Sequence, residues 1–206
     1  MTRRTINTLG STTLNHADRE DMDFYQTPDF ATKTLLHHLL FPETIWEPMA
    51  GNGAISKILV KNGFNVISTD IVERKFKLNA TLDYFDSETF LTQLPDTFSI
   101  ITNPPYEFAN EFLKYTLTKI QPLQCCVFLP VRYLEGQQRY NEIYSQFKPS
   151  KVLMYVKRLG CYKQADVEAG KVTERGVGSA VAYMWLCFDR DQWLDPNTKT
   201  TLDWIN

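Results

Sequence analysis

Short apolar runs alternate with amphipathic segments along most of the chain. The apolar runs, which predict buried strands, cover residues 44–49, 65–71, 98–103, 124–130, 151–157 and 180–188. Between them, apolar residues recur at helical spacing and predict helices at 28–40, 53–62, 107–119 and 137–147. This alternation predicts an α/β fold with a mostly parallel, doubly wound, Rossmann-like sheet, in which the last two predicted strands form an antiparallel edge hairpin.

One apolar run ends in an unusual turn. Residues 98–102 lead directly into Asn103-Pro104-Pro105-Tyr106, and two consecutive prolines end the strand because proline donates no hydrogen bond to the ladder. The turn leaves an amide, a free carbonyl and an aromatic ring at the carboxyl edge of the strand. These groups are suited to hold a planar amino group and its ring. Taken alone, the four residues also fit a strand-ending turn with one surface tyrosine.

A second apolar run, at 44–49, leads into the glycine turn Gly51-Asn52-Gly53 and an amphipathic helix. The next predicted strand ends in Asp70, whose carboxylate can accept hydrogen bonds from both hydroxyls of a ribose. Strand, glycine turn, helix, strand and acid together are typical of a nucleoside-binding βαβ unit. The spacing matches neither a dinucleotide motif nor a phosphate loop, and Glu47 before the glycines disfavours a pyrophosphate. These residues favour a ligand with a cationic amino acid end, such as S-adenosylmethionine.

Composition limits the class of protein. A chain of 206 residues, 43% of them apolar, predicts one domain at 23–206 after a flexible N-terminal arm at 1–22. No apolar run is long enough to cross a membrane and no signal peptide is present, so we expect a cytoplasmic protein without a membrane partner. The 4 cysteines form no Cys-x-x-Cys pair, which predicts reduced core thiols and no metal site.

The charge balance gives no general nucleic-acid footprint. The net charge is -2 and the pI is about 5.9, so any contact with a phosphate backbone must come from a local patch. The candidate basic residues, after the strand at 124–130 and in a glycine-rich loop at 157–178, are Arg132, Arg158, Lys163 and Arg175. A salt-bridged helix start and a solvated loop, respectively, explain these charges equally well.

Three motifs, in order, resemble one known family. Asp23-Phe-Tyr-Gln-Thr-Pro28, Glu47-Pro-Met-Ala-Gly-Asn-Gly53 and Asn103-Pro-Pro-Tyr106 are similar to elements of the amino-directed DNA methyltransferases of the N6-adenine type, in the order of the gamma-like class. Residues 129–136 and 183–185 resemble the small methyltransferases of bacteriophages and prophages. The resemblance covers roughly residues 22 to 206. It implies a single Rossmann-like methyltransferase domain, S-adenosylmethionine as cofactor, and the cytoplasm of a bacterial or phage-infected host cell.

The resemblance also implies roles for the motif residues. The Asn103 side-chain oxygen and the Pro104 carbonyl would accept hydrogen bonds from the exocyclic amine of adenine, and Pro105 belongs to the same rigid turn. Tyr106 would stack on the target base, flipped out of double-stranded DNA, and the methyl group would pass to the amine directly, in line. The residues expected to bind the cofactor are Phe24, Gln26, Thr27, Glu47, Met49, Gly51, Gly53, Asp70, Ile71, Asp83, Tyr84 and Asn103.

The same motifs leave other substrates open. The turn also occurs in methyltransferases that modify a glutamine of translation release factors or bases in RNA, and it does not separate adenine N6 from cytosine N4, although asparagine favours adenine. A non-catalytic methyltransferase-like module is a further alternative. We expect no separate target-recognition domain, so the target would be read by the loop at 157–178, the N-terminal arm or a partner. A relaxed or short target and a homodimer both fit this expectation.

Overall fold

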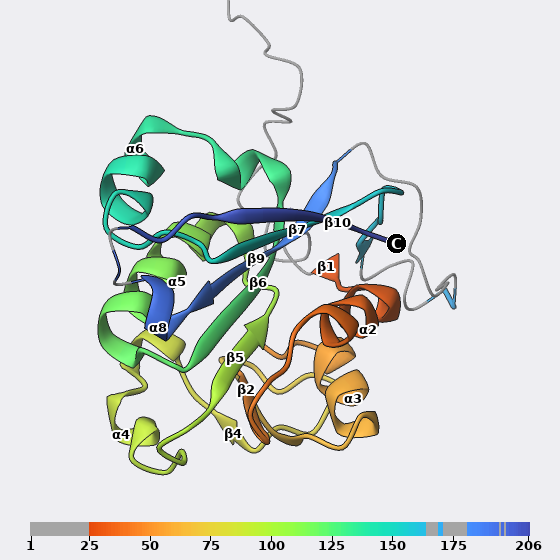
Figure 1. Ribbon diagram of the computed structural model, residues 1–206. Coiled ribbons are helices and arrows are strands. Elements are labelled where there is room, and N and C mark those ends of the chain that lie inside the picture. The colour runs from red at the N-terminus through yellow and green to blue at the C-terminus, as the bar shows by residue number, and fades with distance from the viewer. Residues whose placement is uncertain (1–24, 164–168, 171–180, 194, 196) are drawn as a thin grey trace, which may run out of the picture.

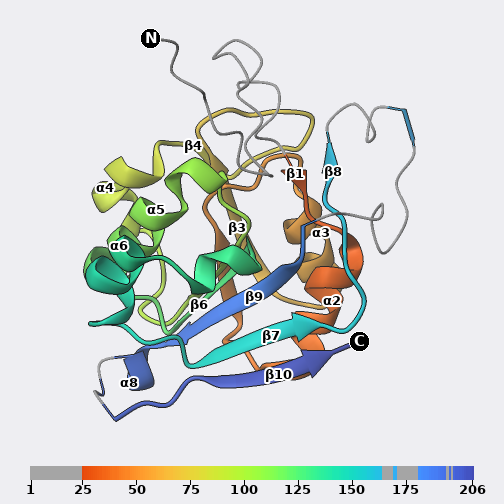
Figure 2. The ribbon, with the colours of Figure 1, turned by 90° about the horizontal axis from the view of Figure 1, so that it is seen from above.

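The computed structural model describes residues 25–163, 169–170, 181–193, 195 and 197–206, so the predicted arm at 1–22 lies outside the described residues. The described residues form three layers, with helices on both faces of a central eight-stranded sheet (Figures 1 and 2). A second sheet consists of two short strands. The predicted α/β class with a mostly parallel sheet is thereby confirmed.

The elements follow in chain order. The strands are β1 (Tyr25–Gln26), β2 (Thr44–Glu47), β3 (Asn65–Asp70), β4 (Ala80–Thr81), β5 (Ser99–Thr102), β6 (Gln124–Pro130), β7 (Lys151–Tyr155), β8 (Tyr162–Lys163), β9 (Tyr183–Asp189) and β10 (Thr201–Ile205). The α-helices are α2 (Asp29–His38), α3 (Ala54–Lys61), α4 (Glu88–Leu91), α5 (Ala109–Tyr115), α6 (Gln137–Arg139) and α8 (Arg190–Trp193). Shorter 3₁₀ or π-helical turns are η1 (Tyr84–Asp86), η2 (Tyr106–Phe108), η3 (Thr116–Ile120), η4 (Val131–Leu134) and η5 (Tyr140–Tyr144).

The order of strands in the large sheet is β10-β7-β9-β6-β5-β2-β3-β4. Neighbouring strands are parallel except at β9, which is antiparallel to both β6 and β7. The antiparallel pair of β7 and β9 was predicted, but its place at the sheet edge was not correct. The edge is β10, which the apolar pattern missed and which pairs in parallel with β7. Thr201–Ile205 alternates polar and apolar residues, and only Ile205 of this strand is buried.

Strand side chains alternate between two apolar cores, one on each face of the sheet. In β6, Cys125 and Val127 belong to the core under α5, whereas Cys126 and Phe128 belong to the core under α2 and α3. Because β6 is covered on both faces, it is apolar at every position after Gln124, as is usual for strands inside an α/β sheet. Its predicted bounds are therefore correct to the residue.

The helices bury one stripe each, and their ends differ from the predicted ones. In α3, Ile55, Ile58 and Leu59 face the core, and the chain turns out of the helix at Gly63, which has a φ of +89°. The predicted helix at 107–119 is divided into η2, α5 and the π-helical η3, and the helix at 137–147 into α6 and η5. Packing on the sheet decides these local windings, which apolar spacing alone does not encode.

The strand order reverses between β2 and β5. From β2 the chain builds the sheet outward through β3 and β4, and it then returns to add β5 and β6 on the other side. In α/β sheets, ligands bind at such a switch point, outside the carboxyl ends of the strands. The glycine turn follows β2 and the Asn103 turn follows β5, so the fold places the two predicted motifs on either side of this point.

Candidate functional site

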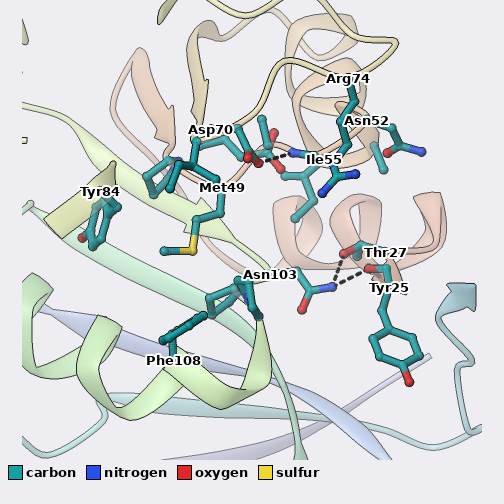
Figure 3. A pocket seen from close by; sticks show the side chains of 18 of the residues that line it. Tyr25, Thr27, Met49, Asn52, Ile55, Asp70, Arg74, Tyr84, Asn103 and Phe108 are labelled. Carbon is teal, nitrogen blue, oxygen red and sulfur yellow. Dashed lines mark hydrogen bonds between the residues drawn. The ribbon is translucent and has the colours of Figure 1, made fainter. Parts of the chain in front are cut away.

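A cavity of about 320 Å³ lies at the switch point, within the size range of small-molecule sites. Figure 3 shows side chains from both motifs pointing toward one space, with Asp70 and Met49 on one side and Asn103 and Phe108 on the other. The lining residues that the sequence predicted are Gln26, Thr27, Glu47, Met49, Gly51, Asp70, Ile71, Asp83, Tyr84, Asn103, Pro104, Pro105 and Tyr106. The two halves of the predicted site therefore border one continuous cavity.

The glycine turn owes its shape to two positive φ angles. Gly51 has a φ of +56° and Gly53 one of +73°, in the left-handed region that favours glycine. A Cβ atom at Gly53 would lie 2.4 Å from ring atoms of Phe76. Gly53 precedes the first residue of α3 and does not line the cavity. In the structure Gly53 thus shapes the turn, whereas the sequence predicted that it would contact the ligand.

Asp70 is fixed at the end of β3 by backbone donors. The Gly51 N–H donates to Asp70 Oδ2 at 2.8 Å, and the Val72 N–H donates to Oδ1 at 3.1 Å. Both bonds hold the carboxylate beside the glycine turn, at the cavity wall (Figure 3). Ile71 follows on the same wall and is 64% exposed, as an apolar side chain that flanks a ligand ring would be.

Glu47 borders the cavity but faces the start of α3. Its Oε2 accepts hydrogen bonds from the Ser56 N–H, at 2.8 Å, and from the Ser56 hydroxyl, which also contacts the Ser68 hydroxyl at 2.6 Å. Burial raises the pKa of the Glu47 carboxyl to about 8, and Asp70 nearby adds to the shift. In the free protein at neutral pH the Glu47 carboxyl is therefore mostly protonated and uncharged, whereas a charged carboxylate was expected from the sequence.

Asp83 and Tyr84, which the resemblance places at the cofactor, follow a short strand and begin a 3₁₀ turn. The strand is β4, and Asp83 caps η1, its Oδ1 accepting a hydrogen bond from the Phe85 N–H at 3.0 Å. Tyr84 is buried, and its hydroxyl lies 2.6 Å from Thr116 Oγ1, pointing away from the cavity in Figure 3. Its ring stacks on Phe112 with centroids 4.7 Å apart. Tyr84 is thus a core residue that also borders the cavity.

Asn103 is held by the segment that precedes α2. Its Nδ2 donates to the Tyr25 carbonyl at 2.9 Å and to Thr27 Oγ1 at 3.0 Å (Figure 3). Asn103 Oδ1 is buried, and no hydrogen-bond partner for it occurs among the described residues. Leaving a buried acceptor without a partner is costly. The amide is therefore oriented with its donor occupied and its acceptor open.

The ring of Tyr106 lies in an aromatic cluster. Tyr25 stacks on it, with centroids 5.7 Å apart and planes inclined by 15°. Tyr183 and Tyr133 lie at 6.2 and 6.5 Å, and the Tyr133 hydroxyl donates to the Tyr106 carbonyl. The Tyr106 hydroxyl lies 3.8 Å from Cys161 Sγ, and burial raises the pKa of Tyr106 well above its usual value. One face of the ring predicted to stack on a base is thus covered by the protein.

Residues 25–27 connect the two motifs. β1 pairs with β8 in an antiparallel two-stranded sheet, Tyr25 opposite Lys163 and Gln26 opposite Tyr162. The Gln26 side chain accepts a hydrogen bond from Asn52 of the glycine turn, while Tyr25 and Thr27 accept those of Asn103. One short segment therefore contacts both halves of the site.

The predicted nucleic-acid residues do not line the cavity where the structure describes them. Arg132, in η4, and Arg158, after β7, are both exposed and are not among the lining residues, while the Lys163 side chain, Phe24 and Arg175 lie outside the described residues. Near Arg132, the Arg139 guanidinium donates to Asn110 Oδ1 at 2.8 Å and to three backbone carbonyls. These contacts give Arg139 a structural role at the start of α6. Contacts of the predicted basic residues with nucleic acid remain predictions.

Several lining residues were missed by sequence reasoning. Among them are Tyr25, Asn52, Ile55, Arg74 and Phe108, and the Arg74 side chain extends toward the cavity in Figure 3. Asn52 and Tyr25 stand inside motifs that the sequence identified, so their position was a usable signal. No sequence signal indicated Arg74, because the turn after β3 carries no motif.

The described residues contain neither a metal-ligand cluster nor a membrane-spanning helix. No group of three or more His, Cys, Asp or Glu side chains there is arranged to hold a metal ion. None of the described helices is both long enough and apolar enough to cross a membrane. The cysteines are free thiols, and Cys125, Cys126 and Cys187 are buried in the core as expected.

Known proteins share the fold at low sequence identity. No protein-family model matches the chain, and no curated protein matches it. Among solved structures, it is similar to a "modification subunit of a putative type I restriction enzyme from Vibrio vulnificus YJ016", with a TM-score of 0.51 and 12% identity over 88% of this chain and 47% of that chain. A "putative hemolysin from Lactococcus lactis" aligns with a TM-score of 0.49 and 8% identity over 85% of this chain and 91% of that chain.

The chain spans about half the length of the Vibrio vulnificus protein, 47% of it. At 12% identity, this likeness shows a shared fold. Together with the strand order, it indicates a Rossmann-like α/β fold.

Proposed function

We propose that the chain is an S-adenosylmethionine-dependent methyltransferase that methylates an exocyclic amine of a DNA base, adenine N6. The observation that carries this proposal is the state of Asn103 at the switch point. Its Nδ2 is occupied by Tyr25 and Thr27, and its buried Oδ1 has no partner among the described residues. A buried acceptor without a partner, on a residue that lines the cavity, suits a substrate that brings an amino donor.

The chemistry of the substrate explains why such acceptors are needed. An exocyclic amine of adenine is a weak nucleophile because its lone pair is delocalised into the ring. Asn103 Oδ1 and the Pro104 carbonyl would accept its two N–H groups and favour the tetrahedral geometry that localises the lone pair. Bound S-adenosylmethionine would supply a methyl group on a sulfonium centre. The chain's own contribution is positioning and electrostatic preorganisation.

The other half of the cavity fits the cofactor. Asp70, fixed by two backbone donors, would accept the ribose hydroxyls, and Gly51 leaves the backbone open to close approach. Ile71 and Asp83 would flank and contact the adenine end. Gln26 and Thr27 would cover the methionine end, beside Asn103.

The surroundings of Tyr106 favour a nucleobase over a glutamine side chain. Aromatic rings bind other rings by stacking, and two aromatic side chains of this cluster, Tyr25 and Tyr106, line the cavity. Reaching this cavity requires a base extruded from the duplex. The similar Vibrio vulnificus structure is a restriction-enzyme modification subunit, which supports DNA as the substrate.

The test is methyl transfer from radiolabelled S-adenosylmethionine to unmethylated double-stranded DNA, with RNA and a release-factor glutamine peptide alongside. We expect label in DNA, recovered after digestion as N6-methyladenine, and loss of that label in Asn103→Ala. Asn141→Ala, at an exposed asparagine of η5, is the matched control and should methylate like the wild type.

Other outcomes separate the alternatives. Label in N4-methylcytosine changes the base, and label in RNA or the peptide changes the substrate. Cofactor binding by equilibrium dialysis without label in any substrate would indicate a non-catalytic module. Activity that persists in Asn103→Ala would remove the catalytic turn from the mechanism.

A further inference from the structure

We infer that Thr27 is a positioning residue, which sets the orientation of the Asn103 amide. The resemblance to a known family gave Thr27 a place at the cofactor only, whereas the structure connects it directly to the catalytic turn, 76 positions away. The inference rests on the proposed role of Asn103 as an acceptor.

The geometry at Asn103 leaves little freedom to its amide. The two acceptors of its Nδ2, the Tyr25 carbonyl at 2.9 Å and Thr27 Oγ1 at 3.0 Å, lie on the side away from the open oxygen. The Thr27 side chain is only 3% exposed, so water does not readily replace it as an acceptor. Two acceptors for the two hydrogens of one amide nitrogen fix that nitrogen, and hence place Oδ1 on the opposite side.

Thr27 is itself held by the core. It lies at the start of α2, where the Ala31 N–H donates to the Pro28 carbonyl at 2.9 Å. The Ala31 carbonyl in turn accepts hydrogen bonds from Trp185 Nε1 at 2.9 Å and from the Tyr155 hydroxyl at 3.1 Å. These two donors belong to β9 and β7, so the packing of α2 on the sheet sets the place of the Thr27 hydroxyl relative to Asn103.

If the Asn103 amide were rotated so that its oxygen and nitrogen exchanged places, it would lose both its anchoring hydrogen bonds and its free acceptor. Its oxygen would face the Tyr25 carbonyl, which is an acceptor and cannot donate. Its nitrogen would point into the site and offer N–H groups to a substrate amine that needs acceptors. Removing the Thr27 hydroxyl takes away one of the two bonds that prevent this turn, while leaving the open oxygen chemically intact.

The test compares Thr27→Val, which removes the hydroxyl at nearly constant volume, with Thr27→Ser, which keeps it. We expect Thr27→Val to lower kcat for DNA methylation by about tenfold, the change that follows from losing one hydrogen bond to a buried group. The KM for DNA should change by less than about twofold, and Thr27→Ser should restore most of kcat. Thr44→Val is the matched control, since Thr44 is a buried threonine of β2 that does not line the cavity and whose hydroxyl accepts a hydrogen bond from Asn65 instead.

A second readout needs no turnover. In the full chain labelled with ¹⁵N-asparagine, the side-chain N–H₂ signals of Asn103 are assigned by their loss in Asn103→Ala. Their exchange with solvent should be slow in the wild type and in Thr27→Ser, and faster in Thr27→Val. An unchanged kcat in Thr27→Val, or equal exchange in all variants, overturns the inference. Absence of DNA methylation by the wild type, with slow exchange retained, contradicts the proposed function and leaves the positioning contact established.

Discussion

The two halves of the candidate site are built in different ways. The glycine half, β2-α3-β3, is one continuous stretch, and its key hydrogen bond joins Gly51 to Asp70 across 19 positions. The Asn103 half is assembled from segments far apart in the chain. Asn103 bonds to the carbonyl of Tyr25 and the hydroxyl of Thr27 across 78 and 76 positions.

This difference separates what each half depends on. A local βαβ unit needs its glycines and its acid, and its contacts form when the unit folds. The Asn103 half needs α2 docked on the sheet and β1 paired with β8 before its side chains meet. We therefore expect substitutions in the glycine half to change cofactor binding and stability. Substitutions in the Asn103 half should change turnover and substrate use.

The largest expected effect is on turnover in the Asn103 half. Asn103→Ala should lower kcat by about 10² to 10³, the range for removing one preorganised polar group. In the glycine half, Asp70→Ala should instead weaken S-adenosylmethionine binding by roughly tenfold or more, because hydrogen bonds to a charged group contribute about 1.5–3 kcal/mol. Cofactor titration calorimetry and steady-state rates measure the two. The comparison fails if both variants lose affinity and turnover alike.

The next effect concerns the stacked tyrosines, for which we expect opposite signs. Tyr106→Ala should raise the KM for DNA, since base stacking on an aromatic ring contributes about 1–3 kcal/mol. Tyr25→Ala should lower it, because Tyr25 covers the Tyr106 ring and an aromatic pair is worth about 0.5–1.5 kcal/mol. Tyr140→Ala, at a ring 58% exposed on η5, is the control. A rise in KM for Tyr25→Ala would make that ring part of the binding surface rather than its cover.

A smaller effect separates backbone strain from close packing in the glycine half. Gly63→Ala should lower the free energy of unfolding by about 1–2 kcal/mol, because its φ of +89° is unfavourable for alanine and nothing else lies within 4 Å of the added Cβ. Gly53→Ala should lower it further, because Phe76 ring atoms lie 2.4 Å from that position. Urea unfolding measures both. Equal losses of unfolding free energy in Gly63→Ala and Gly53→Ala would mean that the Phe76 ring moves aside without cost.

The smallest effect is a pH dependence from Glu47. Its folded-state pKa of about 8 lies above the ordinary value of 4.5, so between these values the folded protein holds a proton that the unfolded chain has released. This contribution to stability is complete below pH 4.5 and is lost as the pH rises through 8. From pH 6 to pH 7 the wild type should lose about 1 kcal/mol relative to Glu47→Gln.

Urea unfolding at several pH values follows this difference. The control is Glu43→Gln, which removes an exposed carboxyl four positions earlier and should keep the pH profile of the wild type. Parallel profiles for the wild type and Glu47→Gln would contradict the raised pKa.

The sequence predicted those parts of the fold in which residues of one segment carry the signal. The strands β2, β5 and β6 are buried along all or nearly all of their length, and their apolar runs identify them. β3, which is buried only at Ser68 and Thr69, was identified from the βαβ pattern. β10 was missed because four of its residues are exposed, so pairing with β7 and not burial makes it a strand. The π-helical ends of α5 and α6 depend on packing in the same way.

At the site, the motifs predicted which residues surround the cavity but not their contacts. Tyr84 was expected beside a ligand, yet its hydroxyl bonds to Thr116 in the core. Glu47 was expected to be charged, yet burial makes it an acid at neutral pH. Both corrections come from desolvation and long-range partners, which have no signature in a short motif.

By itself, the sequence determined the order of elements, the glycine turn, the asparagine turn and the acid at the end of β3, because each depends on backbone chemistry within a few residues. Only the tertiary structure decided that β9 lies inside the sheet and β10 at its edge. It also decided that Tyr25 covers Tyr106 and that Thr27 holds Asn103 with its oxygen open. Those contacts join segments separated by most of a domain, and they exist only because helix α2 and the strands bury their apolar faces against one another.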